Sequence, residues 1–211
     1  MYVPATPALP AVALAPAGIV STAPLTLSKP VHTALRVRAQ QLNVLAGHPA
    51  TVTGTLRPGL PGKAVALQML GQHGWRTLTR TLTGVQGRFR LRYVSRQTGS
   101  ELVRLRFVGD ASNLGARRRL GRLNIYHLAG ASWYGGGGQT ACGASLTSST
   151  QGVANKTLPC GTLVTLRYDG RSVQVAVIDR GPYVAGREFD LTQATKQALG
   201  FGDTGQVWST R

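Results

Sequence analysis

The chain has 211 residues, a length that accommodates two small domains with a hydrophobic core each. Its formal net charge is +17, and almost all of this excess lies before residue 131, because residues 131–211 hold seven basic and five acidic groups. No stretch is long and apolar enough to span a membrane. A membrane-spanning protein is therefore excluded, and an anionic partner is expected for the first part of the chain.

Residues 1–31 are rich in Ala and Pro, and Lys29 is their single charged side chain. Such a composition cannot bury a core, so we expect a disordered or extended leader or linker. The small residues at 11–15 are typical of the end of an export signal, although no basic segment precedes them and Pro16 follows. A start codon placed too late, or a truncated leader, would explain this pattern.

Residues 32–128 predict a β-sandwich. Short alternations of apolar and polar residues recur along this part, and turn sequences such as Arg57-Pro58-Gly59 and Gly84-Val85-Gln86-Gly87 separate them. The expected strands are 50–56, 63–70, 76–82, 87–94, 101–108 and 120–126, with a seventh near 34–37. The pattern resembles the bacterial immunoglobulin-like modules that serve as spacers on secreted proteins.

Two of these expected strands carry arginine at every second position. The basic residues are Arg88, Arg90 and Arg92 on the first strand and Arg104 and Arg106 on the second. Because alternate side chains share a face, the five arginines form one ladder if the two strands pair. The ladder is either a solvated face or a surface that attracts a polyanion in a salt-dependent manner, and in an envelope the natural partners are anionic wall polymers.

Nucleic acid is the competing partner for this basic module. The sequence shows no recognition helix and no zinc-ligand spacing, and Phe89 and Tyr93 point away from the arginines, so they offer no stacking platform. We therefore expect no nucleic-acid binding. The four histidines lie in or beside this module, scattered over turns and strand ends, which predicts no metal site.

Cys142 and Cys160 are the only cysteines of the chain. Their spacing is not a Cys-x-x-Cys motif and no histidine flanks them, so it does not indicate a metal site. They form either one disulfide, which would stabilise the domain by about 3 kcal/mol in an oxidising compartment, or two buried free thiols. A disulfide would pin the Ala/Ser/Thr-rich loop between them.

A buried strand near the carboxy terminus ends in an acid. Valine recurs at 173, 175 and 177, and Ala176 and Ile178 make the other face apolar too; Asp179 follows before Gly181-Pro182 breaks the strand. A carboxyl group at this place is either a proton donor, kept neutral by burial against the valines, or a turn cap that pairs with Arg180 or Arg187.

The residues on both sides of this strand predict a hairpin and a short helix. Strands at 162–168 and 172–178 flank Asp169-Gly170, which is typical of a tight hairpin turn, so Asp169 is a turn residue. Apolar residues from 191 to 199 recur at helical spacing, and Asp190 before them is the expected N-cap. Trp208 is expected in the core.

Several motifs in this half of the chain occur together in a fixed order. They are Ala131-Ser132-Trp133-Tyr134-Gly135, Thr140-Ala141-Cys142-Gly143, the run at 152–162, Asp179-Arg180-Gly181-Pro182 and Gly186-Arg187-Glu188-Phe189-Asp190-Leu191. In this order and spacing, residues 131–211 resemble the rare lipoprotein A (RlpA) family, whose domain is a six-stranded double-psi β-barrel related to expansin-type wall-loosening modules. The expected fold of the chain is therefore all-β, an immunoglobulin-like β-sandwich followed by a double-psi β-barrel with one short helix.

This resemblance implies a secreted or cell-envelope protein that acts on peptidoglycan glycan strands. The better-known members are lytic transglycosylases, in which an acid protonates the glycosidic oxygen and then, as a base, helps the muramyl 6-hydroxyl to close an anhydro ring. Asp179 matches that acid. Many members also carry an acidic pair where this chain has residues 143–150, and a histidine where it has Asn155, so those groups are absent or replaced here.

Six further residues are candidates for binding the glycan. They are Trp133, Tyr134, Asn155, Arg180, Tyr183 and Glu188. Aromatic rings stack on sugar faces, and Tyr183 is the first choice because it lies four residues from Asp179. Glu188 is the only backup for a second acid, since a pair of carboxylates would permit glycoside hydrolysis.

Two main functions remain open for a chain that we expect to be exported, monomeric and free of cofactor and metal. The first is a peptidoglycan lytic transglycosylase with Asp179 as general acid and base. The second is a noncatalytic, expansin-like module that binds or loosens the wall. In either case the short junction at 128–130 predicts that the two domains touch.

Overall fold

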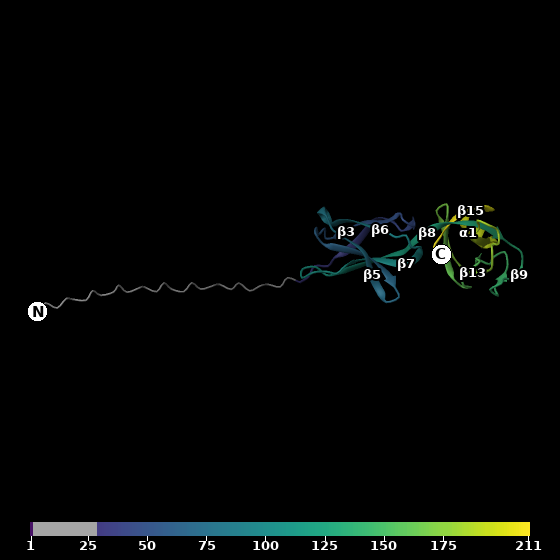
Figure 1. The fold of residues 1–211 in the computed structure, drawn as a ribbon. Coiled ribbons are helices and arrows are strands. Elements are labelled where there is room, and N and C mark those ends of the chain that lie inside the picture. Colours follow the sequence, from purple (N-terminus) through teal and green to yellow (C-terminus); the bar gives the residue numbers. More distant parts are fainter. Residues whose placement is uncertain (2–28) are drawn as a thin grey trace.

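The computed structural model describes Met1 and residues 29–211, so most of the expected leader lies outside the described residues. The described part is built almost entirely from strands (Figure 1). The strands of the first half are β1 (Ala34–Gln41), β2 (Asn43–Leu45), β3 (Pro49–Arg57), β4 (Ala64–Gly71), β5 (Gly74–Leu82), β6 (Arg88–Val94) and β7 (Gly99–Phe107), with a 3-10 turn η1 (Val85–Gly87) before β6. Strand β8 (Ala116–Tyr134) continues from this half into the second.

Two sheets of the first half pack face to face. One has the order β1-β3-β6, and the other joins β5, β4, β7 and β8, with the short β2 alongside β8. Alternate residues of each strand point inward, so Val52 and Leu91 from the first sheet share a core with Leu67, Leu105 and Leu123 from the second. All seven expected strands are present, whereas the likeness to immunoglobulin modules stays a prediction.

The expected five-arginine ladder is wrong as a single surface. Strand β6 pairs with β3, whereas β7 pairs with β4 and β8, so the two basic strands belong to different sheets. The physical reason is burial, because Phe89 of β6 and Val103 of β7 both turn into the same core and the arginines must then face opposite outer surfaces. Arg104 lies 4.0 Å above the Trp75 ring on the outside of the second sheet.

The second half forms a closed barrel of six strands with one short helix. Around the barrel, β8 is followed by β14 (Phe189–Thr192), β11 (Val153–Ala154), β13 (Arg171–Asp179), β12 (Leu163–Tyr168) and β15 (Thr204–Ser209), and β15 pairs with β8 again. The pairs β14–β8 and β11–β13 are parallel, and the others are antiparallel. The expected barrel with its short helix is confirmed.

The β12–β13 hairpin turns at Asp169-Gly170, as expected. Asp169 has φ 43° and Gly170 has φ 78°, the left-handed conformations that a tight two-residue hairpin turn requires. Helix α1 (Gln193–Leu199) ends at Gly200, also as expected, but its N-cap is Thr192, whose hydroxyl accepts from the Thr195 N–H. The prediction of Asp190 as N-cap was wrong, because Asp190 is still within strand β14.

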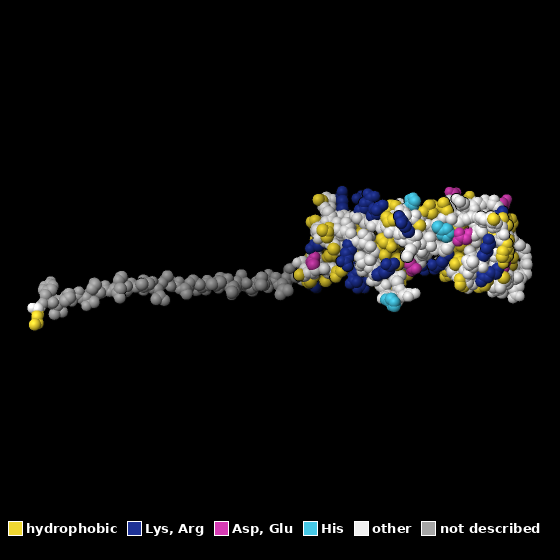
Figure 2. Space-filling model, viewed as in Figure 1, with side chains coloured by type: hydrophobic (Ala, Val, Ile, Leu, Met, Phe, Trp, Pro, Cys, Tyr) yellow, Lys and Arg dark blue, Asp and Glu magenta, His cyan; other side chains and the backbone are white. Residues whose placement is uncertain are grey.

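Residues 128–130, the expected junction between the two halves, lie within strand β8 and are not a flexible linker. Strand β8 pairs with β7 through Ile125 and with β15 from His127 onward, so one strand serves both the sandwich and the barrel. On the face seen in Figure 2, Lys and Arg side chains gather over the sandwich, where Asp and Glu are few. Within the described residues, no helix is long and apolar enough to cross a membrane.

Candidate active site

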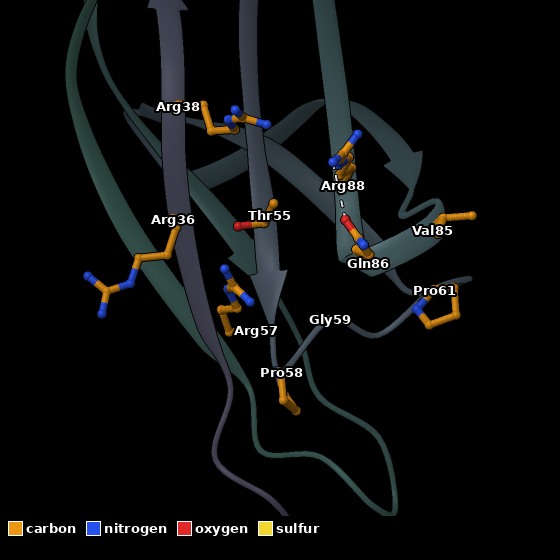
Figure 3. Close-up of a pocket in the computed structure, with 10 residues that line it drawn as sticks. All are labelled: Arg36, Arg38, Thr55, Arg57, Pro58, Gly59, Pro61, Val85, Gln86 and Arg88. Carbon is orange, nitrogen blue, oxygen red and sulfur yellow. Dashed lines mark hydrogen bonds between the residues drawn. The ribbon is translucent and has the colours of Figure 1, made fainter.

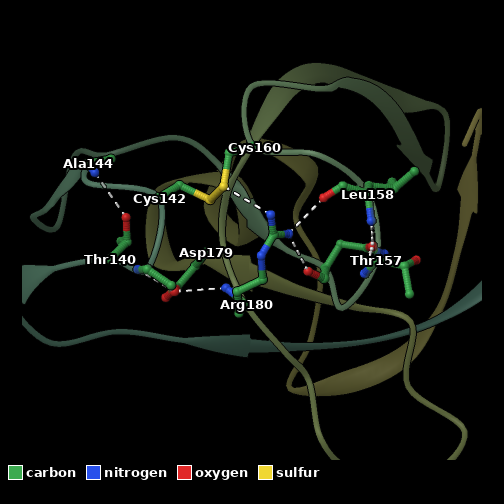
Figure 4. The surroundings of a disulfide bond; sticks show 10 residues. Thr140, Cys142, Ala144, Thr157, Leu158, Cys160, Asp179 and Arg180 are labelled. Carbon is green, nitrogen blue, oxygen red and sulfur yellow. Dashed lines mark hydrogen bonds between the residues drawn. A yellow bond between two sulfur atoms is a disulfide. The ribbon is translucent and has the colours of Figure 1, made fainter.

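Asp179 is the last residue of β13, and the backbone holds its carboxylate. Oδ1 accepts hydrogen bonds from the backbone N–H of Ala141 at 2.9 Å and of Arg180 at 2.8 Å (Figure 4). The side chain is half-buried and forms no ion pair with an arginine in the part of the chain that the structure describes. The carboxylate thus caps two backbone groups through one oxygen, and Oδ2 has no hydrogen bond within residues 29–211.

Arg180 turns away from Asp179 and braces a loop. Its guanidinium donates to the carbonyl oxygens of Asn155 at 3.0 Å and Leu158 at 2.7 Å, and lies 3.0 Å from the Sγ atom of Cys160 (Figure 4). Cys160 is joined to Cys142 by a disulfide. The bond ties the segment that carries the Ala141 N–H to the braced loop, so the support of Asp179 is itself fixed.

The Asn155 side chain holds the loop at 155–158 in place, and the residue also lines a surface hollow. Its side chain is 4% exposed, and its Nδ2 donates to the Glu188 carbonyl oxygen at 3.1 Å. Its Oδ1 accepts from the backbone N–H groups of Thr157 at 3.0 Å and Leu158 at 2.8 Å. The side chains of Asn155 and Arg180 both shape this loop, and their contact with substrate stays a prediction.

The sheet brings a second carboxylate near Asp179. Ala154 of β11 lies opposite Asp179 on one side and opposite Asp190 of β14 on the other, and Asp190 lies opposite Ser132 of β8. Asp190 and Ser132 are regular cross-strand partners and share a face, whereas Ala154 pairs with Asp179 across a β-bulge; both acids lie close enough for their charges to act on Tyr134. The Ser132 hydroxyl donates a hydrogen bond to Asp190.

The Tyr134 hydroxyl is enclosed near these two acids. It is buried and has no hydrogen-bond partner of ordinary geometry in the described part of the chain. Burial raises the pKa of Tyr134 well above its usual range, and the negative charges of Asp179 and then Asp190 raise it further. Tyr134 is therefore a neutral phenol near two carboxylates, and stacking of its ring on a sugar stays a prediction.

Asp190 is the functional candidate that sequence reasoning missed. The prediction placed Asp190 at the N-cap of the helix and not in a strand. However, Phe189 and Leu191 on either side of it are fully buried. This alternation of buried and half-buried residues was the signal for a strand. It would have placed the carboxylate on the barrel face instead of at a helix end.

The other predicted glycan contacts differ in exposure. Tyr183 is 81% exposed, on the loop that follows Asp179. The Trp133 indole N–H donates to Asp203 at 2.9 Å, and the Lys196 ammonium lies 4.0 Å from the ring centre, so one face of that ring is covered. The accessible aromatic ring of the loop is thus Tyr183, and its contact with a sugar stays a prediction.

Trp208 is not the core residue that was expected. Its ring is half-buried, packs at 5.7 Å from the Tyr126 ring centre and lines a hollow of about 490 Å³ on the barrel exterior together with Arg167 and Gln206. The reason is its parity in β15, where Val207 and Ser209 point inward and leave Trp208 on the outer face.

Glu188, the predicted backup acid, has its carboxylate engaged elsewhere, and its role as a second acid stays a prediction. Its carboxylate pairs with the His127 ring at 3.0 Å and lines a separate hollow of about 460 Å³, which does not include Asp179. Within residues 29–211, no three His, Cys, Asp or Glu side chains come together as a metal site would require. The chemistry available at this site is that of two carboxylates and a phenol.

Comparisons with known proteins agree on the second half of the chain. The family described as lytic transglycolase matches residues 128–208. The probable endolytic peptidoglycan transglycosylase RlpA of Aquifex aeolicus is 45% identical over 75 residues, which cover 33% of this chain and 33% of that protein. The protein of the same name from Synechocystis is 35% identical over 126 residues, covering 52% of this chain and 39% of the relative.

The chain thus spans between a third and two fifths of the length of these curated relatives. Among solved structures, the Streptomyces papain inhibitor is 25% identical, and the match covers 41% of this chain and 94% of the inhibitor with a TM-score of 0.34. The six-stranded closure, the motifs and the relatives agree over the same residues. Residues 128–208 form an RlpA-like double-psi β-barrel.

Proposed function

We propose that this chain is a cell-envelope protein whose barrel cleaves peptidoglycan glycan strands as a lytic transglycosylase. The relatives named for this activity, and the family match over the barrel, support the reaction class. The observation that carries the proposal is the grouping of Asp179, Asp190 and the buried Tyr134 hydroxyl at one place in the barrel wall.

In this proposal Asp179 transfers the proton through Oδ2, because Oδ1 is occupied by two backbone N–H groups. The protonated acid donates to the glycosidic oxygen as the bond between that oxygen and the muramyl C1 breaks, and the leaving sugar keeps the proton. The resulting carboxylate then removes the proton of the muramyl 6-hydroxyl. That oxygen bonds to C1, which closes the anhydro ring and returns Asp179 to its acid form.

Asp190 and Tyr134 have supporting roles in this scheme. Positive charge develops at C1 as the glycosidic bond breaks, and the Asp190 carboxylate, held by Ser132, is a fixed negative group near Asp179. The Tyr134 hydroxyl donates toward whichever carboxylate carries the charge.

Digestion of purified glycan strands tests the proposal. The wild-type chain is expected to produce new 1,6-anhydro-muramyl ends, measured by mass spectrometry of the released fragments. Asp179→Asn is expected to lower the rate at least about 100-fold, since it removes the proton-transfer group and keeps the shape.

Asp169→Asn is the matched control. Asp169 is an acid of the same barrel at a turn with φ 43°, a conformation that asparagine tolerates. The control should retain the wild-type rate. Wild-type protein that binds wall sacculi but forms no anhydro ends would contradict the enzyme and favour the noncatalytic, expansin-like alternative.

A further inference from the structure

The outer surface of the β1-β3-β6 sheet is a continuous basic face. Its six arginines, which we call the arginine face, are Arg36, Arg38, Arg57, Arg88, Arg90 and Arg92, and all are exposed. They come from three adjacent strands whose register places threonine in the middle, so that Arg36 and Arg88 lie on either side of Thr55. Thr53 and Thr51 occupy the next two positions along β3, opposite Arg90 and Arg92.

A hollow of about 900 Å³ lies at one end of the arginine face. Arg36, Arg38, Arg57, Arg88 and Thr55 line it, with the Arg36 side chain pointing away from Thr55 (Figure 3). The turn at Pro58-Gly59 and the segment around Gln86 form the wall. Figure 3 shows Arg38 and Arg57 on either side of Thr55 along the strands.

The wall of this hollow is firmly packed. A Cβ atom added at Gly87 would lie 2.2 Å from the Leu56 carbonyl oxygen and 3.0 Å from the Gly59 Cα atom. Gly87 also has φ 70°, so no other residue would fit this contact without strain. The two turns are therefore locked against each other, and the hollow keeps its shape without a ligand.

No carboxylate neutralises these arginines in the part of the chain that the structure describes. The three ion pairs among residues 29–211 use Lys63, His127 and Lys196, and none uses an arginine. Within the hollow, Arg88 donates only to the amide oxygen of Gln86, at 3.2 Å. Like charges on adjacent strands repel, so the arginines of the folded face destabilise one another. A bound anion would relieve this repulsion.

We propose that the arginine face binds a linear phosphodiester polymer that has no bases, with one phosphate seated in the hollow. Guanidinium forks match phosphate oxygens bidentately, and the Thr55 hydroxyl supplies a further donor. Residues two positions apart along a strand are separated by about 7 Å. The second and third phosphates of the polymer would therefore contact Arg90 and then Arg92. Phe89 and Tyr93 point into the core, so the face has no ring on which a base could stack. This binding is a property of the sandwich and does not depend on cleavage by the barrel.

Fluorescence anisotropy of the full chain with a labelled ten-repeat poly(glycerol phosphate) tests the proposal. The triple variant Arg36→Gln/Arg57→Gln/Arg88→Gln is expected to bind at least about tenfold more weakly. Its slope of log Kd against log salt concentration should fall by about 0.7, since contact with the one phosphate in the hollow is lost.

The matched control removes three arginines from the opposite sheet, by the substitutions Arg106→Gln/Arg117→Gln/Arg119→Gln. The register of β7 and β8 places these three residues together on the outer face of that sheet, and they do not line the hollow. This control should bind within about twofold of the wild type at 0.15 M salt. An equal loss in both triple variants would mean that only net charge matters and would overturn the proposal.

Two further measurements separate the site from its alternatives. Thr55→Val keeps the charge and nearly the volume, and is expected to weaken binding about threefold with an unchanged melting temperature, because one charge-assisted hydrogen bond is lost. Unchanged binding of the Thr55→Val variant would show that the hollow is not part of the polymer-binding site. Single-stranded DNA with ten phosphates should bind more weakly than the polymer, and tighter binding of DNA would overturn the assigned class of ligand.

Discussion

Three polar side chains show how single residues define the candidate site. Backbone N–H groups orient Asp179, and a serine hydroxyl orients Asp190. Tyr134 differs, because its hydroxyl is buried without a hydrogen-bond partner of ordinary geometry among residues 29–211. The charges of Asp179 and Asp190 both act on this phenol, and the proposed function uses its hydroxyl as a donor toward them.

Replacing Tyr134 by phenylalanine should leave the free energy of unfolding unchanged or raise it by up to about 1 kcal/mol at pH 7. The effect grows in alkali, because the folded state keeps this phenol neutral while the unfolded chain ionises it near its ordinary value of 10.0. The wild type therefore loses stability as the pH rises above 10, and the variant should lose about 1.4 kcal/mol less per pH unit.

Urea denaturation at pH 7 and at pH 11 measures this effect, with Tyr183→Phe as the exposed control that should behave like the wild type. A loss of more than about 1 kcal/mol at pH 7 would show that the Tyr134 hydroxyl makes a real hydrogen bond in the folded protein and would contradict the prediction.

Sequence reasoning reached Asp179 but not its partners, for a physical reason. Asp179 follows four apolar residues at 175–178, and a turn sequence comes after it, so its position at the end of a strand could be read locally. The neighbourhood of Asp190 and Tyr134 depends on β11, β14 and β8 meeting across the barrel. These pairings join segments far apart in the sequence, so no pattern within one segment predicts them. Asn155 and Arg180 were assigned to substrate because they lie in the family motifs, and the structure shows in addition that hydrogen bonds within the fold use both.

At the scale of elements, the strands follow from their alternation of side chains, and their pairing does not. Strand β3 alternates buried and half-buried residues along almost its whole length, and its expected range of 50–56 agrees with the structure. Strand β11 has only two residues, too few for any period to be seen. The arginine ladder failed for the same reason, since alternation gave the correct faces for β6 and β7 and said nothing about which sheet each strand joins.

Gly54 in the middle of β3 is a site where an element depends on a missing side chain. A Cβ atom there would lie 2.2 Å from the Arg36 carbonyl oxygen and 2.6 Å from the Phe89 ring. Gly54→Ala should therefore lower the free energy of unfolding by about 1–3 kcal/mol through overpacking. Gly202→Ala, where nothing lies within 4 Å, is the control. Equal stability of both variants by urea denaturation would show that the β1-β3 contact is looser than described.

At the scale of the whole molecule, the sandwich and the barrel share a strand. The sequence predicted two domains that touch at a short junction, but β8 passes from one to the other without a break. The ring of Tyr126, fully buried, packs on Trp208 of the barrel and bonds to Asn43 of the sandwich through its hydroxyl at 2.9 Å. The two halves are therefore expected to unfold together.

Thermal unfolding of the full chain, followed by circular dichroism and by tryptophan fluorescence, should show one coincident transition. Trp75 reports on the sandwich, whereas Trp133 and Trp208 report on the barrel. Insertion of two glycines between Tyr126 and His127 should split the transition into two, because the shared strand is interrupted. Two separate transitions in the wild type would contradict the coupling.

The 19 residues of β8 have a mechanical consequence. At about 3.3 Å per residue, an extended segment of that length reaches roughly 60 Å, and it behaves as a stiff rod rather than a tether. If the sandwich holds a polymer and the barrel cleaves glycan, as proposed, the shared strand would keep the two sites at a constant spacing and orientation. Cleavage would then fall at a set distance from the anchoring polymer, so the molecule would determine where the glycan is cut as well as cut it.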